Sequence, residues 1–196
     1  MKKIDPKLAQ PEIYNPDKGR IQAIDIPKMR FLAIEGYGKP TEQNFKDATQ
    51  TIYNVAYAIK YLIRKEMNIE LTVMPLEVIW DLDHPDKEFG WTMMIMQPHY
   101  VTQKHYDKSF EILKTSDKTL PLEADLKFIE YKAGIVLQAL HIGPYDKISE
   151  TIDLMKAYAE EDECEIEENT HDIYLNDMRK TLPQRLKTVV LIKIIK

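Results

Sequence analysis

The sequence predicts an α+β fold made of two similar halves, and three repeated features support this. An apolar strand that ends in a glycine turn occurs twice, as FLAIEGYG and as VLQALHIGPY. A helical pattern follows each copy. Two further strand-like segments then complete each half, PLEVIWDL with GWTMMIMQP and THDIYLND with KTVVLIKI. We therefore expect duplicated strand-helix-strand-strand halves, with antiparallel sheets that carry one main helix each and a ligand cleft between the halves. The halves are residues 21–100 and 127–196, joined by 101–126 into a single domain.

The bulk properties favour one globular domain and exclude several function classes. The chain has 196 residues and 44% hydrophobic content, which is enough for a sizeable core. Its net charge of −5 and pI of about 5.6 disfavour direct nucleic-acid binding, which needs clustered cations. The N-terminus lacks a signal-peptide pattern, and no segment has the length of a membrane helix. Cys164 is the one cysteine, so no disulfide framework is expected and a cytoplasmic location is predicted.

The first half begins after a proline-rich segment, residues 1–20, which we expect to be an extended surface arm. A strand alternates from Ile21 until Pro27, and the next runs from Phe31 to Glu35. Thr41 is the predicted N-cap of the long helix. The helix has an aliphatic stripe at three- and four-residue spacing, formed by Phe45, Ala48, Ile52, Val55, Ile59 and Leu62. Beside the stripe, Tyr53, Tyr57 and Tyr61 either flank the core or line a cavity.

The strands and helices expected after residue 72 are assigned from the same periodicities and turn residues. Strands are expected at residues 72–81 and 90–97, joined by the turn sequence DHPDKEF. Residues 102–117 have helical spacing, and 118–125 form a connector. Residues 127–133 and 135–141 alternate like a hairpin around Gly134, and a second main helix is expected near Asp146. The acidic run at 160–168 is predicted to be a solvated loop.

The usual catalytic and cofactor motifs are absent from the sequence. There is no phosphate-binding glycine loop, dinucleotide fingerprint, nucleophile elbow or HExxH helix. The five histidines are not at paired ligand spacing. We therefore expect no metal and no cofactor.

Two carboxylates in the middle strands are the candidate polar residues. Alignment of the halves sets Glu77 of PLEVIW opposite Asp172 of THDIYL, each within an apolar strand. Buried carboxylates are costly unless they are paired, hydrogen-bonded or functional. Either they are structural carboxylates, or the two strands bring them to face one another across a cleft. In the second case Glu77 is the candidate for proton transfer.

Aromatic residues from the same segments are expected to line that cleft. Aromatic walls with one or two anions suit flat apolar or cationic molecules. His141 either reaches the cavity or is a core histidine. In the C-terminal run, either Arg179, Lys180, Arg185 and Lys187 form a basic surface patch or Arg179 pairs with a nearby acid. The predicted ligand-binding residues are Tyr53, Tyr57, Glu77, Trp80, Trp91, His141, Tyr145, Asp172 and Tyr174.

Seven segments together resemble the stand-alone members of the GyrI-like small-molecule-binding family: PKMRFLAIEGYGKP, IYNVAYAIKY, MPLEVIW, GWTMMIMQP, QALHIGPYDK, HDIYLND and LPQRLKT. The resemblance implies a tandem pair of SHS2-type modules with a ligand cleft between them. Glu77 matches the glutamate of the family's PLE motif, and Trp91 matches the aromatic residue that opens the next strand. Asp172 stands where the family usually has glutamate.

Three functions are compatible with these features. The first is a soluble protein that binds lipophilic xenobiotics, cationic aromatic molecules among them. The second, implied by the resemblance, is a hydrolase that opens the ring of cyclopropane-bearing DNA-alkylating compounds within the same aromatic cage. The third is an interaction domain without a small ligand. The sequence leaves the oligomeric state open.

Overall fold

The centre of the protein is one eight-stranded antiparallel sheet with strand order β2-β8-β10-β9-β5-β6-β3-β7. The computed structural model describes residues 1–81 and 89–195. A small parallel sheet pairs β1 with β4. The strands are β1 Lys2–Ile4, β2 Ile21–Ile26, β3 Met29–Tyr37, β4 Ile69–Leu71, β5 Leu76–Asp81, β6 Gly90–Gln97, β7 Lys127–Tyr131, β8 Gly134–Ile142, β9 Ile166–Tyr174 and β10 Lys187–Ile194. The helices are α1 Pro11–Tyr14, α2 Gln43–Met67, α3 Gln103–Lys114 and α4 Ile148–Glu161, and short 3-10 turns include η1 Pro6–Ala9 and η3 Tyr145–Lys147.

The chain order confirms the duplicated architecture, but the two halves share one sheet. The first half supplies β2, β3, α2, β5 and β6, and the second supplies β7, β8, α4, β9 and β10. The halves meet where β5 pairs with β9, which we call the seam. The first strand of each half crosses to the other half, because β2 pairs with β8 and β7 pairs with β3. The expected hairpin around Gly134 is therefore wrong.

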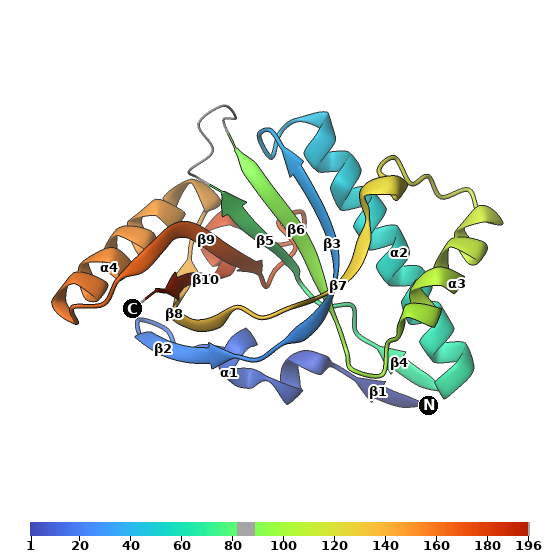
Figure 1. Ribbon diagram of the computed structural model, residues 1–196, viewed down its shortest axis with the longest axis horizontal. Coiled ribbons are helices and arrows are strands. Elements are labelled where there is room, and N and C mark those ends of the chain that lie inside the picture. The colour runs from blue at the N-terminus through green and yellow to red at the C-terminus, as the bar shows by residue number, and fades with distance from the viewer. Residues whose placement is uncertain (82–88, 196) are drawn as a thin grey trace.

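The long helices α2 and α4 lie on the same side of the sheet, which we call the helix face. Figure 1 shows α4 and α2 at opposite ends of the molecule, with the strands crossing between them. In the predicted stripe of α2, Ala48, Ile52, Val55 and Ile59 are fully buried, and Phe45 at its start is partly buried. On α4, Met155 packs in a separate cluster with residues of β8 and β10. Each half thus places one helix over its own strands.

The residues at the helix termini differ slightly from those expected. The N-cap of α2 is Glu42 rather than Thr41, and the C-cap after Met67 is Asn68, which has the left-handed conformation with φ 56°. A 3-10 turn, Tyr145–Lys147, precedes α4. The acidic run is only partly a loop, since α4 extends to Glu161 and β9 begins at Ile166. The expected turn at 83–89 lies almost wholly outside the described residues.

The N-terminal arm packs on the opposite side of the sheet, which we call the arm face (Figure 1, blue). It forms β1, η1 and α1, so the expectation of an extended surface arm is wrong. Ile13 and Tyr14 are 1% and 3% exposed. The side-chain amide of Gln138 on β8 donates to the carbonyl oxygens of Glu12 and Ile13. The arm therefore contributes to the core.

No helix in the part of the chain that the structure describes is long and apolar enough to cross a membrane.

Candidate functional site

The register at the seam decides which side chains share a face. Val78 lies opposite Asp172, Leu76 opposite Tyr174 and Glu77 opposite Ile173. Directly opposed residues of antiparallel strands project to the same face, and successive residues alternate. Asp172 and Tyr174 thus lie on the helix face, and Glu77 lies on the arm face. Of the two alternatives, the one in which Glu77 and Asp172 face one another across a cleft is therefore wrong.

A one-residue error in the alignment of the halves explains this result. A twofold axis between the paired residues Val78 and Asp172 superposes strand β5 on strand β9. It places Val78 on Asp172 and Glu77 on His171. The same relation equates Trp80 with Tyr174. Because side chains alternate along a strand, a slip of one residue moves every side chain to the other face.

An aromatic cluster covers the seam on the helix face. We define it as Phe45 of α2, Trp80, Trp91, Tyr145 and Tyr174. Phe45 stacks on Trp80 with ring centroids 5.8 Å apart, and its centroid lies 5.3 Å from that of Trp91 in an edge-to-face contact. The rings of Tyr145 and Tyr174 are 5.1 Å apart. The indole N–H of Trp80 donates to the Tyr174 hydroxyl at 3.2 Å, which joins the two parts of the cluster.

Asp172 is buried beneath this cluster with one oxygen unpaired. Its residue exposure is 3%, and Oδ2 accepts a 3.5 Å hydrogen bond from the Tyr174 hydroxyl. Oδ1 has no partner among the described residues, and neither has the buried hydroxyl of Thr188. Thr188 lies opposite Tyr174 in the sheet and so projects to the helix face. Burial raises the pKa of Asp172 to about 7, although the His171 charge and nearby donors oppose this shift.

Residues of α2 and of the loop after β9 lie near Tyr145 of the cluster, since Tyr53 and Asp177 each interact with it electrostatically. Tyr53 is half-buried and Tyr57 is 57% exposed, and their ring centroids are 6.3 Å apart. The guanidinium of Arg179 donates two 2.9 Å hydrogen bonds to the Asp177 carboxylate. Burial raises the pKa of Tyr53, and the charges of Asp177 and Arg179 act on it in opposite directions. The loop after β9 therefore lies close to α2.

Trp91 and His141 are both held by local contacts. The Trp91 indole N–H donates to the carbonyl of Gly38 at 3.1 Å, and a Cβ at Gly36 would overlap its ring. Trp91 therefore forms the buried base of the cluster. The His141 ring contacts the Thr151 hydroxyl at 2.8 Å and the Pro144 carbonyl at 3.2 Å. These contacts favour the core-histidine alternative.

Glu77 is a hydrogen-bonded buried carboxylate on the arm face. It is 1% exposed and accepts a 2.9 Å hydrogen bond from the Tyr14 hydroxyl. Its other oxygen lies 2.8 Å from Nε2 of His171. These contacts are those of a structural carboxylate. The hydrogen-bond partners of Glu77 in the described residues, Tyr14 and His171, do not belong to the aromatic cluster.

Comparison with protein families identifies the fold. The profile of the GyrI-like small molecule binding domain matches residues 20–195. The chain belongs to this family. No curated protein sequence matches this GyrI-like chain.

Solved structures of similar proteins agree with this assignment. An uncharacterized conserved protein from Listeria innocua is 28% identical, with TM-score 0.86 over 97% of this chain and 99% of that one. A hydrolase from Listeria innocua is also 28% identical, with TM-score 0.83 over 98% of this chain and 100% of that one. The C-terminal domain of EcmrR shares the fold at 11% identity, with TM-score 0.59 over 90% of this chain and 98% of that one.

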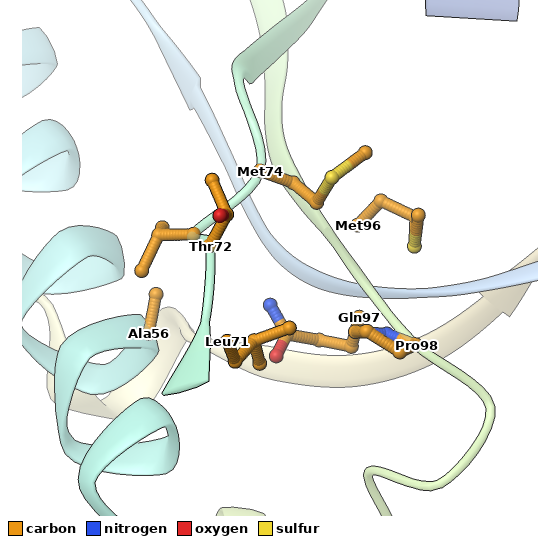
Figure 2. Close-up of a pocket in the computed structure, with 8 residues that line it drawn as sticks. Ala56, Leu71, Thr72, Met74, Met96, Gln97 and Pro98 are labelled. Carbon is orange, nitrogen blue, oxygen red and sulfur yellow. The ribbon is translucent and has the colours of Figure 1, made fainter. Parts of the chain in front are cut away.

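A pocket away from the cluster lies between α2, β4 and β6 of the GyrI-like domain, as Figure 2 shows. Its lining includes Ala56, Leu71, Met74, Met96 and Gln97. The interior has room for about one water molecule. It is too small to be the ligand site of this conformation.

Sequence reasoning missed several residues at these sites. Phe45 was assigned only to the core stripe, although it contacts both tryptophans of the chain. Thr188 and His171 carry no motif, and only the strand pairing places them. Tyr14 lies in a segment without hydrophobic periodicity. Its one sequence signal is the pair Ile13 and Tyr14 within a polar, proline-rich arm.

Proposed function

We propose that this GyrI-like protein binds flat, lipophilic small molecules, aromatic cations among them, at the aromatic cluster over the seam. The observation that carries the proposal is the unpaired Oδ1 of Asp172, buried beneath aromatic rings. A buried polar atom without a partner is costly and often marks a functional site. A ligand with a hydrogen-bond donor or a positive charge would supply the missing partner, and the rings would bind its apolar surface.

Binding requires the rings to move. The closest aromatic centroids in the cluster are 5.1 to 5.8 Å apart, so no flat molecule fits between them in the present conformation. We propose that Tyr145 and Tyr174 separate when a ligand enters. Tyr145 lies in a 3-10 turn rather than on a strand, so it can shift without breaking the sheet.

Intrinsic fluorescence tests the proposal, because both tryptophans of the chain belong to the cluster. A panel of planar neutral and cationic aromatic compounds would be titrated into the protein. We expect saturable quenching or a spectral shift with some of them. Trp80→Phe should weaken binding, because Trp80 contributes both ring surface and the hydrogen bond to Tyr174. The proposal fails if no compound changes the emission and none protects the protein from thermal unfolding.

A second candidate function is hydrolysis of strained electrophiles such as cyclopropane-bearing DNA-alkylating compounds. The full-length similarity to a hydrolase from Listeria innocua favours it. In this function Asp172 replaces Glu77 as the proposed proton donor, since its pKa is raised to about 7. Water would bond to a ring carbon while the cyclopropane C–C bond breaks. The conjugated carbonyl would take the electron pair and the Asp172 proton, and the attacking water would return a proton to the carboxylate.

Product analysis separates the two functions. The protein would be incubated with a cyclopropane-bearing alkylator, and the ring-opened alcohol would be followed by mass spectrometry. Hydrolysis predicts turnover that exceeds the protein concentration and falls strongly in Asp172→Asn. Binding without turnover would exclude hydrolysis of that compound and leave the binding proposal in place.

A further inference from the structure

A second cluster of polar side chains lies on the arm face, away from the aromatic cluster. Nε2 of His171 is 2.8 Å from Oε2 of Glu77, and their side chains are only 10% and 1% exposed. The Tyr14 hydroxyl donates to the other Glu77 oxygen at 2.9 Å. Among the described residues, His171 is the sole ion-pair partner of Glu77. An ionised Glu77 carboxylate can only accept, so this contact then places a hydrogen on Nε2.

The other ring nitrogen of His171 has no hydrogen-bond partner. Nδ1 is buried, and none of the described side chains or backbone groups reaches it. His171 is one of the residues that line a pocket on the arm face, together with Ile79, Tyr131, Val136, Glu167 and Lys193, and the Tyr131 ring lies 6.3 Å from its own ring. The pocket has room for a molecule of only a few non-hydrogen atoms. A buried, unpartnered nitrogen on a residue that lines a pocket calls for an explanation, and an absent ligand is one.

The charges around the pocket indicate the class of that ligand. An imidazolium is the ring state that would compensate a buried Glu77 carboxylate, and both nitrogens of an imidazolium are donors. In that state Nδ1 would need an acceptor, whereas in a neutral ring with its hydrogen on Nε2 it would need a donor. Lys193 at the pocket pairs with Glu167 at 3.0 Å, and both side chains are at least one-third exposed. The negative charges of Glu77 and Glu167 balance the positive charges of Lys193 and a His171 imidazolium. A bound monoanion therefore adds less uncompensated charge than a dianion.

We propose that this arm-face pocket binds a small carboxylate monoanion, with His171 Nδ1 as the buried donor and Lys193 as the cation beside it. The pocket is separate from the proposed ligand site, because His171 and Asp172 are successive residues of β9 and project to opposite faces. Its occupant also differs in chemistry, since it is small and anionic rather than aromatic. The two proposals can therefore fail independently.

Nitrogen-15 NMR of the histidine rings tests this proposal, with acetate as the probe. Of the five histidines, His171 would be assigned with the variant His171→Gln. We expect acetate to produce a saturable shift of the His171 Nδ1 signal. Lys193→Met should weaken acetate binding about threefold, and Glu167→Gln should strengthen it about threefold. The side chains of Lys193 and Glu167 are partly exposed, so these two variants should fold. They keep the test usable even if His171→Gln fails to fold.

Two comparison ligands complete the test. Phosphate at neutral pH should bind more weakly than acetate, and ethylammonium should leave the His171 signal unchanged. The proposal is overturned if acetate does not shift Nδ1, or if Lys193→Met and Glu167→Gln respond alike. Tighter binding of phosphate would overturn the assignment to a monoanion.

Discussion

Asp172 lies in an environment that disfavours its charge. Its pKa in the folded protein is about 7, compared with 3.8 for an ordinary aspartate. At a pH between these two pKa values, the carboxyl group of Asp172 is protonated in the folded protein and ionised in the unfolded chain. Folding stability therefore falls as pH rises through this window, and it is greatest at the acidic end as far as this group is concerned. The protein tolerates that cost at a site where a ligand would benefit from it.

We predict that Asp172→Asn is more stable than the wild type at about pH 8 and loses most of that advantage at about pH 5. The amide removes a charge that is buried at high pH. The full shift corresponds to an upper limit of about 4 kcal/mol. Urea unfolding at both pH values measures the difference. A variant less stable than the wild type at the higher pH would show that the carboxylate is compensated.

Tyr14 is the residue that ties the arm to Glu77. Tyr14→Phe removes the hydroxyl that donates to the buried carboxylate, so we predict a loss of about 1–3 kcal/mol in unfolding free energy. Tyr61→Phe serves as the control because its side chain is 54% exposed on α2. Denaturant midpoints of the two variants measure the effect. Equal midpoints would mean that the arm contributes little to stability through this contact.

At the scale of elements, the end of β3 fixes the base of the aromatic cluster. The Trp91 ring lies where a side chain at Gly36 would be. We predict that Gly36→Ala displaces Trp91, costs about 1–3 kcal/mol and changes the tryptophan emission. The control is Gly134→Asn, where φ is 76° and an added side chain would enter open space. Unaltered emission in Gly36→Ala would contradict the close packing of Trp91 against the end of β3.

The sequence predicted those elements whose pattern is local. The stripe of α2 repeats over many turns, so Ile52, Val55 and Ile59 were placed correctly in the core. The arm was mispredicted because its burial depends on Tyr14 reaching Glu77, which is 63 residues away in the chain. The start of β9 was missed because its Glu167 and Glu168 are acidic residues that pair with Lys193 and Lys156 from other elements.

For a related reason, the sequence could not show which side chains of β5 and β9 project to the same side of the sheet. Whether Asp172 or His171 shares a face with Trp80 depends on the pairing of β5 with β9, which are far apart in the chain. An alignment of two short apolar strands is ambiguous by one residue, and one residue exchanges the faces. Candidate residues such as Trp80, Tyr145, Asp172 and Tyr174 are brought together, whereas Glu77 is placed on the other side.

At the scale of the whole molecule, the exchange of first strands joins the halves. β2 extends the sheet beside β8, and β7 extends it beside β3, so neither half has a complete sheet by itself. The aromatic cluster lies over the seam and takes residues from both halves. Ligand binding at the aromatic cluster would therefore depend on how the two halves pack against each other.

The central claim is that Asp172, and not Glu77, is the carboxylate of the small-molecule site. The most direct test is a fluorescence titration of a planar aromatic cation into the wild type, Asp172→Asn and Glu77→Gln at about pH 8, where Asp172 is mostly ionised. Thermal melting would first establish that all three are folded. We predict that Asp172→Asn weakens binding at least about tenfold, as expected for loss of a buried charge, while Glu77→Gln binds like the wild type. Weakened binding in Glu77→Gln with unchanged binding in Asp172→Asn would contradict the account.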